Sequence, residues 1–142
     1  AIFAFPYELP DYIESYQVFA DPIYFIQHKN RKSKEIDNGS LLMLEQGHCL
    51  RSHILQNNEI STKHISNFSC TSISTLVAMV DTNIGVSFLP RMAIDFGVLS
   101  HYPNINIDLK STKAKRDIGV IYRKNNPQEE NIIKLATLLM TS

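Results

Sequence analysis

A run of four apolar residues, Leu41 to Leu44, most strongly limits what this chain can fold into. A short, continuous apolar run is typical of a strand that is covered on both faces, as the strands of parallel sheets are. Gly47 allows a sharp turn after this run, and the residues from His48 to Leu55 have helical spacing. The pattern therefore predicts a buried strand, a turn and a helix that begins close to Cys49.

Strands and helices are expected to alternate along the rest of the chain. The clearest helix covers residues 72–82, has Thr71 or Ser72 as its N-cap, and carries an apolar stripe formed by Ile73, Leu76, Val77 and Val80. Further helices are expected at 48–55, 91–96 and 127–140, and strands at 64–69, 85–90, 105–109 and 118–122. This order predicts an α/β domain with a mainly parallel or mixed sheet.

The segments at the two ends of the chain are also assigned from their patterns. Extended segments are expected at 1–5, 16–19 and 23–26, with Pro22 interrupting or bending the chain between the last two. The polar residues 27–40 are interpreted as a loop. In the last helix, Pro127 suits the first turn, and the expected apolar face consists of Ile132, Ile133, Leu135, Ala136 and Leu139.

The composition excludes several broad classes of protein. With 44% hydrophobic and 20% charged residues over 142 positions, the chain is globular rather than disordered. Its 14 basic and 14 acidic side chains cancel, so it is not an evident nucleic-acid binder. No stretch reaches the roughly 18 apolar residues that a membrane span needs. Two cysteines make no disulfide scaffold, which favours a reducing, cytoplasmic setting. Because the chain opens on what looks like a buried strand, we expect a fragment or a truncated product.

Cys49 is the first candidate for chemistry. A helix N-terminus and neighbouring cations stabilise a thiolate, and His48 and Arg51 flank this cysteine. His48 either assists the thiol or is a surface or capping histidine, and Arg51 either acts on the thiol or an anion, or forms a plain salt bridge. The residues alone leave Cys49 either as a reactive thiol or as a small apolar filler.

A second candidate site is the expected start of the 72–82 helix. Thr71 and Ser72 lie where a helix N-terminus favours an anion, and simple capping is the alternative role for both. No metal site and no cofactor are expected, because the remaining histidines lack ligand spacing: His28, His53, His64 and His101.

Three segments together resemble the effector-binding (regulatory) domain of LysR-type transcriptional regulators. They are residues 41–51, the Thr71-Ser72 pair followed by 76–80, and residues 85–90. Asn83 stands where the family usually places glycine, and both residue types tolerate positive φ. Residues 42–51 and the strand 118–123 are most similar to the OxyR-like subgroup, whose members sense hydrogen peroxide.

The resemblance implies a two-lobe, periplasmic-binding-protein-like (type 2) α/β fold with mixed sheets. Residues 1–19 and 117–142 would form part of an incomplete first lobe, and residues 20–116 the second lobe. The winged helix-turn-helix domain, through which such regulators bind promoter DNA, is not expected in this chain. The family also implies a homodimer or higher oligomer without membrane attachment. Its interface helix would present Ile73, Val77 and Val80, for which core packing is an equally good interpretation.

The resemblance further implies a sensor in which hydrogen peroxide oxidises Cys49, with His48 and Arg51 assisting. Two positions depart from the subgroup: Ser52 replaces an acidic residue, and Asn58 replaces the resolving cysteine. Cys70 is the only other cysteine, so it is the possible resolving residue, and a structural role is the alternative.

Two other functions remain open at this stage. In the first, the domain binds a small organic anion between its lobes at Thr71 and Ser72, and Cys49 is a bystander. In the second, the chain is a thiol peroxidase-like enzyme, but no resolving cysteine stands in the usual place, so we expect no enzyme.

Overall fold

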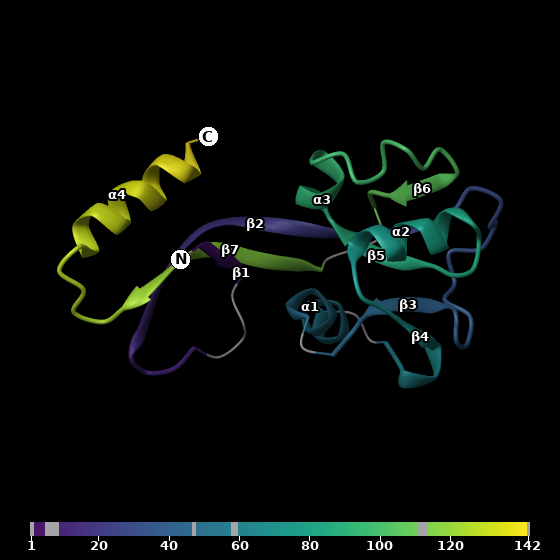
Figure 1. Cartoon of the computed structure of the whole chain (residues 1–142), viewed down its shortest axis with the longest axis horizontal. Helices are drawn as coiled ribbons and strands as arrows, with labels where there is room; N and C mark the ends of the chain where they lie inside the picture. Colours follow the sequence, from purple (N-terminus) through teal and green to yellow (C-terminus); the bar gives the residue numbers. More distant parts are fainter. Residues whose placement is uncertain (1, 5–8, 47, 58–59, 111–113, 142) are drawn as a thin grey trace. The chain divides into compact units, whose positions relative to one another are not determined.

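The structure is a computed structural model that describes residues 2–4, 9–46, 48–57, 60–110 and 114–141. The chain forms two compact units, which are described separately (Figure 1). Unit 1 consists of residues 1–21 and 116–142, and unit 2 consists of residues 22–115. The first boundary lies two residues after the one expected from the sequence, and the second lies one residue before it.

Unit 2 is built on strands of mixed direction. Strand β3 (Leu41–Leu44) pairs in parallel with β4 (Ile65–Cys70), and its first residue forms a parallel bridge with Val86. Strand β2 (Ile13–His28) pairs antiparallel with both β5 (Ser87–Pro90) and β6 (Ile105–Asp108). The expected α/β organisation with both directions of pairing is confirmed, but the parallel and the antiparallel strands lie in separate sheets linked by the bridge at Val86.

The helices of unit 2 lie close to their predicted positions. They are α1 (Cys49–Asn57), α2 (Ile73–Asp81) and α3 (Arg91–Asp95), with a 3-10 turn η1 (Thr62–His64) before β4. Helix α2 is capped as predicted, since the Ser72 hydroxyl accepts a hydrogen bond from the Thr75 amide at 3.2 Å. Asn83, with φ of 61°, ends this helix in the left-handed conformation that the sequence predicts.

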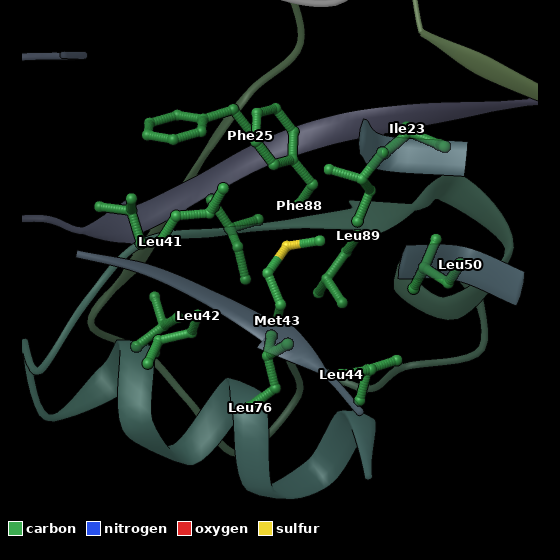
Figure 2. Close-up of a cluster of buried hydrophobic side chains, with 14 of the residues drawn as sticks. Ile23, Phe25, Leu41, Leu42, Met43, Leu44, Leu50, Leu76, Phe88 and Leu89 are labelled. Atoms are coloured by element: carbon green, nitrogen blue, oxygen red, sulfur yellow. The ribbon is translucent and has the colours of Figure 1, made fainter. Parts of the chain in front are cut away.

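Strand β3 occupies the centre of the core of unit 2. Its four side chains are at most 2% exposed and alternate between two sides of the strand. Figure 2 shows Leu42 on the side of Leu76 from α2, and Met43 directed toward Leu89 from β5. The backbone beside β3 is also close-packed, because a Cβ atom at Gly85 would collide with the Ser40 carbonyl and the Leu42 side chain.

Unit 1 contains a small core of its own. Strands β1 (Ile2–Ala4) and β7 (Lys115–Arg123) pair antiparallel, and helix α4 (Glu129–Met140) follows them. The buried members of this core are Val18, Val120 and Ala136. Asp21, buried at the end of this unit, accepts a hydrogen bond at 2.8 Å from Nε of Arg116, and Nη2 of the same guanidinium forms an ion pair with the same carboxylate oxygen, also at 2.8 Å.

Helix α4 corrects part of the predicted apolar face. Ile132 and Leu139 pack against the core of unit 1, but Leu135 is 49% exposed. The 3.6-residue period allowed Leu135 on the inner face, and no described element covers that side of the helix. The helix begins at Glu129, so Pro127 precedes its first turn.

The structure also corrects the expected break at residues 20–22, through which β2 continues. Pro22 is tolerated because pairing between β2 and β5 begins at Ile23, so the missing N–H removes no hydrogen bond from that ladder. The expected loop beginning at residue 27 is wrong as well. Gln27 and His28 are buried and form the end of β2, where both pair with β6.

We predict that Leu76→Ala lowers the free energy of unfolding by about 3 kcal/mol, because it leaves a cavity under β3. Leu138→Ala is the matched control, since this helical leucine is 65% exposed and its truncation should change stability by less than about 0.5 kcal/mol. Urea denaturation followed by circular dichroism measures both. Equal losses in the two variants would contradict the placement of Leu76 in the core.

Candidate functional site

Cys49 is presented by a tight turn that follows β3. The His48 amide donates to the Glu45 carbonyl at 3.3 Å, and the Arg51 amide donates to the His48 carbonyl at 3.0 Å. Cys49 is the first residue of α1, as predicted, and its side chain is exposed. Gly47, the predicted turn residue, lies outside the described residues. The turn therefore leaves the thiol in contact with solvent at the N-terminus of a helix.

Arg51 links the turn to β3 by a hydrogen bond. Its Nη1 donates a hydrogen bond to the carbonyl of Leu44, the last residue of β3, at 3.0 Å. In the parts of the chain that the structure describes, this guanidinium forms no ion pair with a carboxylate. The plain salt bridge considered from the sequence is thus replaced by a hydrogen bond to the backbone. The positive charge stays two residues from Cys49, and His48 beside it is exposed.

Cys70 is in a very different environment from Cys49. It ends β4, is 1% exposed, and its Sγ lies 3.6 Å from the Sδ of Met79 on α2. Burial raises the pKa of the Cys70 thiol above its ordinary value, so the neutral form is favoured. Its backbone carbonyl accepts from the Glu45 amide at 3.1 Å. The backbone of Cys70 thus supports the turn, while its thiol is directed at α2. Sequence reasoning missed this role for Met79, which is not part of the predicted apolar stripe.

The predicted anion site at the start of α2 is largely a cap. The Ser72 hydroxyl is already engaged by the amide of Thr75 and lies 3.1 Å from its Oγ1. Thr71 is exposed beside it. Capping of the helix by Ser72 is confirmed, and ligand binding by the pair stays a prediction.

The three residues expected at a dimer interface do not share one environment. Val77 and Val80 have no exposed surface and pack in the core of unit 2, whereas Ile73 is partly exposed. Core packing, the alternative interpretation, accounts for both valines. The interface role of the three residues, which is compatible with core packing, stays a prediction.

No described helix is long and apolar enough to cross a membrane. Within the same residues, no three His, Cys, Asp or Glu side chains gather in a way that could hold a metal ion.

The sequence model of the LysR substrate binding domain matches residues 8–141. This chain belongs to that family. The regulator EstR of Acinetobacter baylyi is 30% identical over 74% of this chain and 35% of its own length. The dual regulator OxyR of Escherichia coli K12 is 33% identical over 68% of this chain and 32% of its own length. The chain therefore spans about a third of these curated relatives.

Solved structures give the same assignment for the fold. The reduced regulatory domain of OxyR2 from Vibrio vulnificus superposes with a TM-score of 0.88 and 30% identity, covering 99% of this chain and 70% of that domain. The LysR-type, periplasmic-binding-protein-like fold and the likeness to OxyR regulatory domains are thus confirmed.

We predict that the two thiols of the native, reduced protein differ sharply in reactivity. Iodoacetamide should alkylate Cys49 readily because this residue is exposed. Alkylation of the buried Cys70 should be roughly a hundredfold slower, because it requires a local opening that costs about 3 kcal/mol. Peptide mass spectrometry on a time course measures both rates. Denatured protein, in which the rates should converge, is the control. Comparable rates in the native protein would show that Cys70 is not sealed.

Proposed function

We propose that this chain is the sensing part of a peroxide-responsive LysR-type transcriptional regulator, in which Cys49 is the thiol that hydrogen peroxide oxidises. The observation that carries the proposal is the exposed side chain of Cys49 at the first residue of α1, next to His48 and Arg51. The names of several relatives support it, among them the hydrogen peroxide-inducible genes activator of Haemophilus influenzae, 29% identical over 78% of this chain.

The chemistry is a two-electron oxidation of sulfur. The Cys49 thiolate attacks one peroxide oxygen, the O–O bond breaks, and the products are a sulfenic acid and hydroxide, which takes up a proton to become water. Negative charge develops on the departing oxygen. His48 and Arg51 are the neighbouring donors that would stabilise this charge by hydrogen bonds.

The fate of the sulfenic acid depends on the second thiol. Cys70 is buried, neutral and in contact with Met79, so an internal disulfide requires β4 and α2 to separate locally. The two Cα atoms would then have to approach within roughly 7 Å. A persistent sulfenic acid, or a mixed disulfide with a small thiol, needs no such opening. We therefore assign Cys70 a structural role and the sensing step to Cys49 alone.

In the whole regulator, the oxidised domain would act through an oligomer and a separate DNA-binding domain. Such regulators recognise promoter DNA through a winged helix-turn-helix, which the resemblance places outside residues 1–142. Within this chain the proposed role is detection only.

We predict that one equivalent of hydrogen peroxide adds the mass of one oxygen atom to the peptide that contains Cys49. Cys49→Ser should lose this addition completely, and Cys70→Ala is the matched control that should retain it. Intact-protein and peptide mass spectrometry, with a sulfenic-acid-specific trapping reagent, measures the product. If Cys49 stays unmodified in excess peroxide while the denatured chain reacts, the redox role is wrong.

One observation favours a second candidate, a domain that binds a small organic anion. The exposed hydroxyl of Thr71 at the start of α2 is the group on this chain that would meet such an anion.

We predict for this second candidate that a small carboxylate raises the melting temperature of the chain. At a concentration of 100 Kd, the stabilisation should be about 2.7 kcal/mol. Thr71→Val should remove it, while Cys49→Ser should not. Differential scanning calorimetry against a panel of aliphatic and aromatic carboxylates measures the effect. Stabilisation that survives Thr71→Val would place any anion elsewhere.

A further inference from the structure

We propose that unit 2 contains a second ligand site, a pocket that binds small neutral molecules carrying a primary amide. The pocket has a volume of about 220 Å³ and is lined by Gln27, Lys34, Asn106, Ile107 and Asp108. All five residues belong to unit 2. None of them is part of the turn that carries Cys49 or of the start of α2, so this site is separate from both candidate sites above.

The decisive observation is an unmet hydrogen-bond acceptor. Gln27 is 8% exposed, and its Oε1 is buried without a hydrogen-bond partner among the described residues. The other end of the same amide is fixed, because Nε2 donates to the Arg31 carbonyl at 3.3 Å. A carbonyl oxygen cannot donate, so this contact holds Oε1 in its observed direction. A buried acceptor left unsatisfied is costly. Because Oε1 has almost no exposed surface, a ligand N–H satisfies it only by displacing the atoms that now cover it.

The charged residues of the pocket already neutralise each other. Lys34 Nζ lies 2.7 Å from Asp108 Oδ2, and Asp108 Oδ1 accepts from the Lys110 amide at 3.0 Å. An incoming cation would have to compete with Lys34 for the carboxylate, and an incoming anion would have to compete with Asp108 for the ammonium of Lys34. A neutral ligand avoids both conflicts. The charge pattern therefore selects an uncharged donor.

Asn106 supplies the complementary group. It stands directly opposite Gln27 in the antiparallel pairing of β2 and β6, and directly paired residues project to the same face of a sheet. Its exposed amide carries two N–H donors. A primary amide can thus donate its N–H to Gln27 Oε1 and accept at its carbonyl from Asn106. A pocket of about 220 Å³ has room for a small amide.

Acetamide and acetate form a matched pair of probes, because they share shape but only acetamide is neutral and has an N–H donor. Titration of the ¹⁵N-labelled chain with acetamide should give saturable shifts at Gln27, Asn106 and Ile107, with a Kd on the order of 1 mM. Acetate should give none at these residues up to tenfold higher concentration. Equal shifts with both probes, or none with acetamide, would overturn the proposal.

Three variants assign the binding groups. Gln27→Leu keeps the side-chain volume, removes the acceptor, and should abolish the saturable shifts. Asn106→Ala should weaken acetamide binding about tenfold, the loss expected for one hydrogen bond. Asn67→Ala, at another exposed strand asparagine, on β4, should leave the Kd unchanged. If Gln27→Leu fails to fold, the pair Asn106→Ala and Asn67→Ala decides: equal Kd values in the two would refute the site.

Discussion

The burial of β3 on both faces is the constraint on which the rest of unit 2 depends. Its side chains contribute about 2 kcal/mol each by removal from water, and none is more than 2% exposed. Strand β4 pairs with one edge of β3. At the other edge, the Leu42 amide donates a hydrogen bond to the Val86 carbonyl at 2.8 Å. The buried hydroxyl of Ser87 donates to the Leu42 carbonyl, also at 2.8 Å. Burial on both faces and hydrogen bonds along both edges together fix the position of β3.

The position of the candidate thiol follows from that strand. The Leu44 carbonyl is bound by Arg51, and the Glu45 amide is bound by the carbonyl of Cys70. The chain therefore leaves β3 in one direction, and α1 starts at Cys49 with Leu50 and Ile54 buried against the core. The residues that identify the core are thus adjacent in sequence to the residue that carries the proposed chemistry.

This adjacency explains how much the sequence could predict. The start of α1 and the cap at Ser72 depend on a few neighbouring residues, so local patterns sufficed for both. The burial of Gln27 depends on β6, about eighty residues away in the sequence. The residues around Gln27 do not indicate that it pairs with this strand. The prediction that Leu135 is buried is wrong because it also depends on a distant element. An apolar residue at helical spacing is buried only where another element covers it. The unmet acceptor of Gln27 was accordingly beyond sequence reasoning.

Magnitudes indicate where oxidation of Cys49 would act first. Moving β3 means exposing four apolar side chains, at about 2 kcal/mol each. The turn that follows is held by hydrogen bonds such as His48 to Glu45 and Arg51 to Leu44, which contribute about 1 to 2 kcal/mol each. A sulfenic acid is a new polar group that competes for the donors of this turn. Under the proposed function, the turn and the first residues of α1 would therefore rearrange while β3 stays in place.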